Sequence, residues 1–242
     1  MLSYRAVATP YILEITCDSL PKALGAQRGG AHRIELCSNL SKGGLTPGNE
    51  LTRMVREQVQ LPIFTMIRPR AGDFVYSEAE FAQMRREIVT AVELGMNGVV
   101  LGILTADGRV DVERTRQLVE LARPLPVTFH RAFDALADIN QSLEEVIQTG
   151  AARILTSGGA STAMEGRTQL AELVRRGRII IVPGAGITAA NADLLAKETG
   201  AAEFHAGLSS LFLGVDTEEQ RFEDEVRKLA KQLVRHPHGQ DA

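Results

Sequence analysis

Short apolar runs alternate with amphipathic stretches along the whole chain. The runs predict eight strands, at about residues 11–17, 32–37, 62–68, 97–102, 126–130, 152–156, 179–183 and 202–205. Apolar residues three or four apart predict helices at about 20–29, 49–59, 78–94, 111–123, 141–149, 163–176, 189–199 and 217–235. Alternating strands and helices are typical of a parallel sheet. Eight such units predict closure into a single (β/α)8 barrel, the TIM barrel.

A glycine ends most of the helical stretches. Gly30, Gly95, Gly150 and Gly200 each stand just before a predicted strand, and Gly177 marks a shortened copy of the same unit. Glycine directly after a helix adopts the left-handed conformation without a Cβ penalty, so these positions predict helix-to-strand turns. At the start of the third helix, Ser77 and Glu80 have the spacing of a capping box.

The composition sets limits on domain organisation and partners. No linker divides the 242 residues, so residues 1–242 are predicted to form one barrel domain with loose ends at 1–10 and 236–242. The net charge of −3, with acids and bases interspersed, predicts no nucleic-acid or membrane partner. Two cysteines make no disulfide framework, which predicts a reducing, cytoplasmic location. Arg5 and Pro10 interrupt the apolar N-terminus, so we expect no signal peptide.

Alternation along the strands predicts which side chains enter the barrel. Leu13 and Ile15 are expected to face the helices, which turns Glu14 and Thr16 inward. The same reasoning turns several further residues inward, namely Glu35, Cys37, Thr128, His130, Glu203 and His205, with Phe64, Met66 and Arg68 on the third strand.

Ionisable groups are unusual inside a barrel, whose interior is normally apolar. An unpaired buried charge costs several kcal/mol, so these groups must pair, hydrate or bind a ligand. One interpretation is a structural ion-pair network. The other is an active site in which Glu14, Glu35, Arg68 and His130 form one hydrogen-bonded catalytic cluster. Two carboxylates on neighbouring strands would then have pKa values that are driven apart.

The loops after the strands add groups that suit an anion. Arginine forks match carboxylate and phosphate. A surface ion pair explains any single arginine better, and it is the cluster of arginines near one rim that favours an anion. Two glycine-rich loops follow the sixth and seventh strands, where barrels often bind phosphate. The predicted substrate-binding residues are Arg70, Asp73, Arg131, Asp134, Ser157, Gly158, Gly184, Gly186 and His205. We expect no nucleotide cofactor.

Six motifs together resemble the CutC family, which is named for copper homeostasis. They are EITCDS at 14–19, RIELC at 33–37 with GGLTP at 43–47, IRPRAGDFVYS at 67–77, TFHRAFD at 128–134, LTSG at 155–158 and GAG at 184–186. The resemblance implies a cytoplasmic barrel that self-associates, as a dimer or tetramer. It also implies a role in copper tolerance, with Cys17 and Cys37 as candidate Cu(I) ligands. The segment after His205 is shorter than in many relatives.

Two functions therefore remain open. Thiolates suit Cu(I), and Cys17 and Cys37 end adjacent strands about 4.8 Å apart. Their opposite parity favours two small buried apolar residues instead. The alternative is an isomerase, epimerase or lyase that acts on a small anionic or phosphorylated substrate at the C-terminal rim of the barrel. A variant of it places a divalent ion on Glu14, Glu35 and His205.

Overall fold

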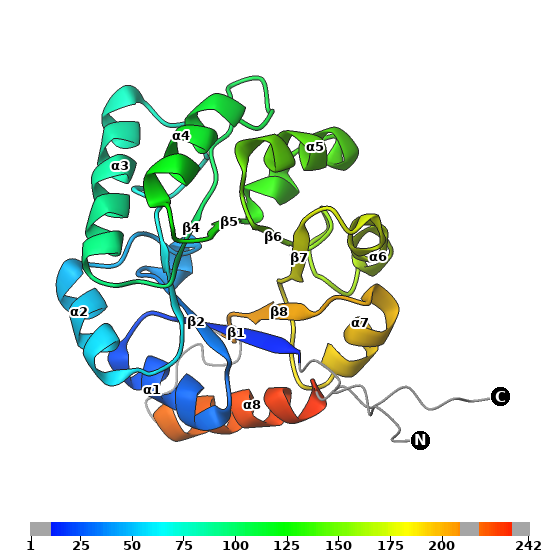
Figure 1. Cartoon of the computed structure of the whole chain (residues 1–242). Coiled ribbons are helices and arrows are strands. Elements are labelled where there is room, and N and C mark those ends of the chain that lie inside the picture. The colour runs from blue at the N-terminus through cyan, green and yellow to red at the C-terminus, as the bar shows by residue number, and fades with distance from the viewer. Residues whose placement is uncertain (1–10, 209–217, 234–242) are drawn as a thin grey trace, which may run out of the picture.

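The computed structural model describes residues 11–208 and 218–233, and it has the predicted (β/α)8 architecture (Figure 1). The strands are β1 (Ile12–Cys17), β2 (Arg33–Leu36), β3 (Ile63–Met66), β4 (Gly98–Leu101), β5 (Val127–Phe129), β6 (Arg153–Thr156), β7 (Ile180–Pro183) and β8 (Glu203–Ala206). The helices are α1 (Leu20–Gly29), α2 (Asn49–Gln58), α3 (Glu78–Glu93), α4 (Val112–Ala122), α5 (Ile139–Thr149), α6 (Arg167–Arg176), α7 (Ala192–Thr199) and α8 (Glu218–Gln232). The predicted loose ends and the shortened segment at 209–217 lie outside the described residues.

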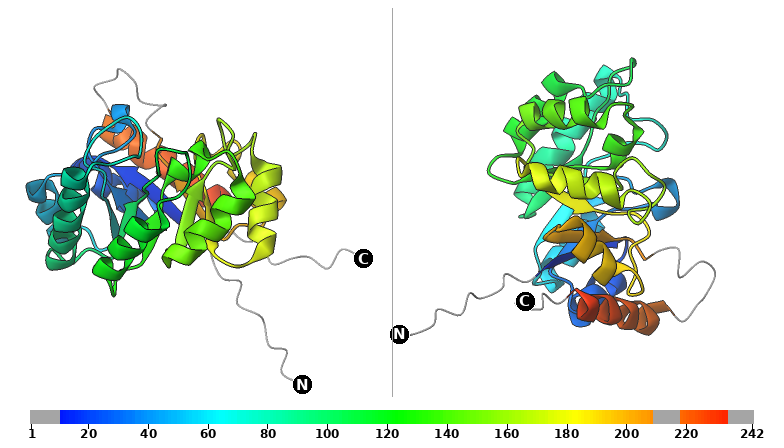
Figure 2. Two further views of the ribbon diagram at one scale, coloured as in Figure 1. Left: turned by 90° about the horizontal axis from the view of Figure 1, so that it is seen from above. Right: turned by 90° about the vertical axis from the view of Figure 1, so that its right-hand side faces the viewer.

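All paired strands are parallel, and they follow one another around the ring. The ladder runs β7-β6-β5-β4-β3-β2-β1-β8, so β1 pairs with β2 on one side and with β8 on the other. The helices surround the strands as an outer layer (Figures 1 and 2). α8 packs against α1, where Val226 lies so close to Gly29 that a Cβ there would meet it at 2.7 Å. The chain thus closes the ring by placing its last helix beside its first.

The helix ends confirm the predicted local signals. Ser77 caps α3 and forms a full capping box with Glu80. Gly30, Gly150 and Gly200 follow their helices with φ of 94°, 84° and 67°. These left-handed turns let each helix lead directly into the next strand.

Three helix starts and two short helices differ from the prediction. α7 begins at Ala192 rather than near 189. α6 begins at Arg167 rather than near 163, because the preceding residues form a turn in which the Ser157 carbonyl lies against Gly166. Asp138 caps α5 two residues earlier than expected. The loops after β2 and β5 contain the 3-10 helices η1 (Leu40–Lys42) and η2 (Arg131–Ala135).

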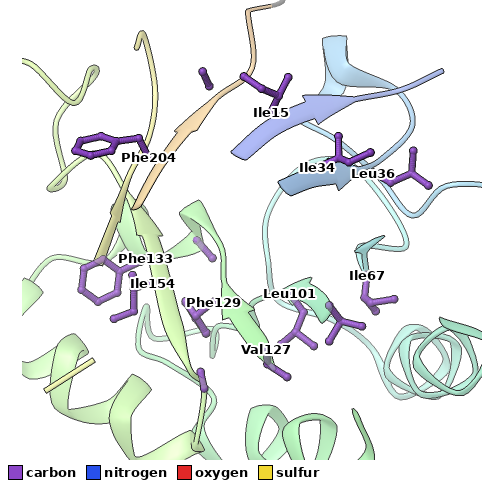
Figure 3. Close-up of a cluster of buried hydrophobic side chains, with 14 of the residues drawn as sticks. Ile15, Ile34, Leu36, Ile67, Leu101, Val127, Phe129, Phe133, Ile154 and Phe204 are labelled. Carbon is purple, nitrogen blue, oxygen red and sulfur yellow. The ribbon is translucent and has the colours of Figure 1, made fainter. Parts of the chain in front are cut away.

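The main core lies between the strands and the helices, as the alternation predicted. Ile15, Ile34, Phe129 and Phe204 are buried in this layer (Figure 3). A separate small apolar cluster consists of Cys37, Phe64, Met66 and Val100, whose parity places it inside the barrel. No helix in the described part of the chain is long and apolar enough to cross a membrane.

Candidate active site at the barrel mouth

A pocket of about 490 Å³ opens where the strands end. It combines strand-end side chains with residues of the loops that follow β2, β3 and β5. Its lining consists of Thr16, Glu35, Leu40, Lys42, Gly43, Gly44, Met66, Arg68, Phe74, His130, Arg131, Asp134, Ala135, Leu155 and His205. Because β-strands of such a barrel present their carboxyl ends at one rim, residues distant in sequence meet here.

Glu14 connects the pocket to the barrel interior. Its Oε1 atom lies 2.7 Å from Nδ1 of His205, whose Nε2 lies 2.8 Å from Oγ1 of Thr16. Its other oxygen accepts a hydrogen bond from Nε of Arg33. Burial alone would raise the pKa of Glu14, but Arg33 and His205 outweigh it and hold the pKa at about 2. Glu14 is therefore an ionised carboxylate that fixes the His205 ring.

Two arginines that the sequence interpretation did not select lie beneath these groups. Arg33 donates from Nη2 to Oε2 of Glu203 at 2.7 Å, and Nε of Arg153 lies 3.6 Å from the same oxygen. Both guanidinium carbons lie 4.7 Å from the centroid of the Phe64 ring. The signal was present, because Arg33 shares the inward parity of Glu35. These ion pairs form a layer beneath the groups of the pocket, in which Nε and Nη1 of Arg153 have no hydrogen-bond partner among the described residues.

Glu35 is a buried carboxyl group with an oxygen left over. It is 3% exposed, and Oε2 has no hydrogen-bond partner in the described part of the chain. Burial raises its pKa to about 7; Glu14 adds to this rise, while His205 and Arg33 oppose it. Glu14 and Glu35 therefore differ as expected for neighbouring carboxylates, one ionised and one close to half-protonated at neutral pH.

Glu14, Glu35 and His205 bring one ligand atom each to within 4.8 Å of one another. The oxygens of Glu14 and the ring nitrogens of His205 already have partners inside the protein. Oε2 of Glu35 is the unused atom of the three. The set therefore offers a single free atom that could bind a metal ion, which is too few to identify a metal centre.

Arg68 is a buried cation without a carboxylate partner among the described residues. Nη1 donates to the carbonyls of Lys42, Gly43 and Gly44 at 3.2–3.3 Å, and Nη2 donates to the carbonyl of Gly72 at 2.9 Å. Its Nε has no partner, and its guanidinium lies 4.8 Å from the centre of the Phe74 ring. Three of the four predicted catalytic residues, Glu35, Arg68 and His130, thus line one pocket, whereas Glu14 bonds His205 behind it. The four do not form one hydrogen-bonded cluster among the described residues.

His130 is held as a neutral imidazole. The amide of Ala132 donates to Nδ1 at 3.2 Å, so Nδ1 acts as an acceptor and the hydrogen resides on Nε2. Burial, with a contribution from Arg68, lowers the His130 pKa to about 3. Nε2 is buried and lacks a partner within residues 11–208 and 218–233. His130 therefore brings one unused N–H donor to the pocket.

The carboxylate of Asp134 accepts hydrogen bonds from backbone amides of the loop after β6. It accepts from the amide of Ser157 at 3.0 Å, from the amide of Gly159 at 3.2 Å and from the hydroxyl of Thr156 at 2.5 Å. Arg131 donates to the same carboxylate at 2.8 Å. An internal carboxylate thus fills the position where the sequence predicted a substrate anion.

Some of the other predicted substrate-binding residues lie at the pocket, and the rest form contacts within the protein elsewhere. His205 lines the pocket, and Gly184 lies beside it, since a Cβ there would be 3.6 Å from the His205 side chain. The amide of Gly158 donates to Oγ1 of Thr156 at 2.8 Å, and Gly186 forms a turn with φ of 70°. Two further predicted residues, Arg70 and Asp73, pair with each other at 2.8 Å and do not line the pocket.

The two cysteines lie in different apolar clusters. The Cys37 amide donates to the Cys17 carbonyl at 3.0 Å, so the backbones are neighbours. Their side chains diverge, because Cys17 belongs to the outer core and Cys37 to the cluster inside the barrel. Burial raises the pKa of both thiols above the ordinary value.

Comparison with known proteins identifies the family. A model of the CutC family matches residues 11–210. The chain belongs to the CutC family. A human protein named copper homeostasis protein cutC homolog is 45% identical over 205 residues, 84% of this chain and 75% of that protein. A CutC family protein of Xanthomonas campestris pv. campestris (strain B100) is 50% identical over 196 residues, 80% of this chain and 82% of that protein.

The fold agrees with this membership. The crystal structure of a CutC protein from Streptococcus agalactiae superposes with a TM-score of 0.77 at 33% identity, covering 81% of this chain and 98% of that one. The family resemblance and the (β/α)8 prediction are both confirmed. Copper binding, self-association and a cytoplasmic location stay predictions.

Proposed function

We propose that this CutC family member is an enzyme that binds a small anionic substrate at the barrel mouth and transfers protons to and from it. One observation carries the proposal. A buried arginine without a carboxylate partner and a buried carboxyl with an unused oxygen line the same pocket, in Arg68 and Glu35. Buried unsatisfied groups of this kind cost stability and are concentrated at functional sites.

The balance of charge around the pocket favours an anion. Arg131 is neutralised by Asp134, and Glu14 by Arg33. Arg68 and the exposed Lys42 have no ion-pair partner in the described residues, and both line the cavity. A guanidinium held by four carbonyls keeps its charge and its orientation, so it can bind an incoming phosphate or carboxylate.

Glu35 is suited to the proton transfer. General acid–base catalysis works best when the pKa of the group lies near the working pH, and the pKa of Glu35 is about 7. Glu14 cannot share this role because it stays ionised and bound to Arg33 and His205. It holds His205 in place and keeps the floor of the pocket rigid.

The test is anion binding by isothermal titration with inorganic phosphate at low salt. The expected result is binding that weakens about tenfold or more in Arg68→Lys, since a point charge replaces a fork anchored to four carbonyls. Arg116→Lys on the surface of α4 is the matched control and should bind as the parent does. Equal binding by all three proteins, or none by any, contradicts the proposal.

Copper handling is the second candidate, because relatives carry the name copper homeostasis protein. The expected ligands, Cys17 and Cys37, do not fit a bridged Cu(I) site, since their side chains belong to apolar clusters on opposite faces of the sheet. Their raised pKa also opposes the thiolate form that the metal needs.

Anaerobic Cu(I) titration against a competing chelator tests this candidate. Tight binding that the Cys17→Ser/Cys37→Ser double variant loses would establish the two-sulfur site and show that the thiols rearrange. Binding that is unchanged in the double variant would remove these two residues as ligands.

A further inference from the structure

Three buried side-chain atoms of residues that line the pocket have no partner in the described structure, and their chemistry is complementary. They are Oε2 of Glu35, Nε2 of His130 and Nε of Arg68. The first is a proton acceptor, the second a neutral hydrogen-bond donor and the third part of a cation. Removal of a proton from a carbon next to a carbonyl group requires such a set: a base, a donor to the oxygen that gains charge, and an anchor.

We propose that the substrate is a small anionic hydroxycarbonyl compound. The Nε2–H group of His130 binds its carbonyl oxygen, and Glu35 removes a proton from the carbon next to that carbonyl. The inference rests on the proposed function and adds the class of substrate and the reaction to it. Arg68 binds the anionic end, whether that end is a phosphate or a carboxylate.

The orientation of His130 is fixed by its surroundings. The Ala132 amide donates to Nδ1 from within η2, and the backbone at Gly102, directly after β4, lies against the ring. A Cβ at residue 102 would meet Nδ1 at 2.6 Å, so glycine is required for this approach. On another side the ring contacts Phe74, with centroids 4.9 Å apart. The unused N–H group is therefore held before any substrate binds.

A neutral donor indicates a carbonyl oxygen as its acceptor. The cation in the pocket, Arg68, is the stronger partner for a full negative charge. A neutral imidazole N–H donates to an uncharged carbonyl and donates more strongly as that oxygen becomes an enolate. It does so without stabilising the ground state as strongly as a cation would, which is the requirement for lowering a barrier.

The reaction balances without any co-reactant. The Glu35 carboxylate takes the proton from the carbon next to the carbonyl, the C–H electrons form a carbon–carbon double bond, and the carbonyl electrons move to oxygen. That oxygen receives the Nε2 proton of His130, which regains a proton from the neighbouring hydroxyl group. As this hydroxyl becomes the new carbonyl, Glu35 returns its proton to the former carbonyl carbon.

The position of the base predicts the outcome. Glu35 is the one pocket carboxyl with an unused buried oxygen in the residues described, since Glu14 and Asp134 are both bound. Removal and return of the proton then occur on one face of the substrate. This favours the interconversion of a hydroxyketone and a hydroxyaldehyde over inversion at carbon, which would need a second base on the opposite face.

The first experiment measures binding of matched pairs of compounds by isothermal titration. Hydroxyacetone phosphate and propyl phosphate have the same charge and differ in the carbonyl group; levulinate and pentanoate form the corresponding carboxylate pair. The expected result is that the parent binds the carbonyl member of one pair about tenfold or more tightly, since an otherwise unpaired buried donor gains its acceptor. His130→Gln should lose this preference and keep its affinity for the member without a carbonyl.

The second experiment follows proton exchange of hydroxyacetone phosphate and levulinate in D2O by NMR. The parent should exchange the protons next to the carbonyl, Glu35→Gln should not, and His130→Gln should be slower by about 100-fold. The Arg116→Lys protein, purified in the same way, should match the parent.

The outcomes separate the two proposals. Binding of both members of a pair with equal affinity, and no exchange, overturns the hydroxycarbonyl inference and leaves the anion site intact. Failure of every anion to bind overturns the proposed function as well. A His130 ring whose nitrogen NMR signals show the hydrogen on Nδ1 at neutral pH also overturns the inference, whatever binds.

Discussion

Arg33 donates from Nη2 to Oε2 of Glu203 at 2.7 Å, inside a barrel whose interior would ordinarily be apolar. The same guanidinium also bonds Glu14, so one buried cation joins two buried carboxylates from β1 and β8. Glu35, the proposed catalytic carboxyl, lies two residues after Arg33 on β2. The ion-pair layer thus couples the stability of the barrel to the electrostatics of the site.

We expect Arg33→Met to lower the free energy of unfolding by about 3–5 kcal/mol at pH 7, because it leaves two buried carboxylates without their shared partner. Urea denaturation measures the change. Arg116→Met on α4 is the control and should cost less than about 1 kcal/mol, as is usual for an exposed ion pair. A loss in Arg33→Met as small as that of the control would show that the layer contributes little to the fold.

Glu35→Gln should change how stability depends on pH. The folded protein has a raised pKa of about 7 at Glu35, against 4.5 as the ordinary value. Below pH 4.5 the Glu35 carboxyl is protonated in both the folded and the unfolded protein. Between pH 4.5 and 7 it ionises in the unfolded chain but stays protonated in the folded one, so the free energy of unfolding of the parent falls. The gain of the variant over the parent should therefore grow by roughly 3 kcal/mol across this window and then level off.

Glu14→Gln is the matched comparison for that experiment. The pKa of Glu14 is lowered to about 2, so its charge stabilises the fold above pH 4.5 and this contribution is lost as the pH falls from 4.5 to 2. This variant should lose stability relative to the parent at neutral pH and converge with it in acid. A difference between parent and Glu35→Gln that does not vary with pH would mean that Glu35 titrates normally.

Gly102→Ala should disturb His130 from behind. The new methyl group would lie 2.6–2.7 Å from two atoms of the imidazole ring, which must shift away from the Ala132 amide. We expect a loss of about 1–3 kcal/mol, the usual cost of overpacking. Gly48→Ala, which meets no atom within 4 Å, should cost about 1 kcal/mol or less as an N-cap change. Equal small losses would show that the ring has room to move.

Asp134→Ala should expose the amides of the loop after β6. The variant removes the acceptor for Ser157 and Gly159, so we expect a loss of about 1–3 kcal/mol. Sulfate should restore part of that stability in the variant and have little effect on the parent, because the freed amides and Arg131 then bind an external anion. Thermal unfolding with and without sulfate measures this. An identical response of both proteins would mean that the loop is no anion site even when empty.

The sequence by itself determined the fold and the direction of the strand side chains. Hydrophobic periodicity and the terminal glycines are local signals, and each element appears near its predicted residues. Strand alternation is equally local, because its period of two follows from backbone geometry. It correctly predicted Glu14, Glu35 and His205 inside the barrel and placed Cys17 and Cys37 on opposite faces.

The tertiary structure decided which group partners which. Arg68 was expected to join a hydrogen-bonded cluster with Glu35, yet it bonds backbone carbonyls of the loops that follow β2 and β3. Asp134 was expected to contact a substrate, yet its carboxylate accepts hydrogen bonds from amides of the loop after β6. Such pairings join segments far apart in the chain through irregular backbone, and no sequence period encodes them. The unused atoms of Glu35 and His130 became visible in the same way, because a polar group lacks a partner only relative to everything packed around it.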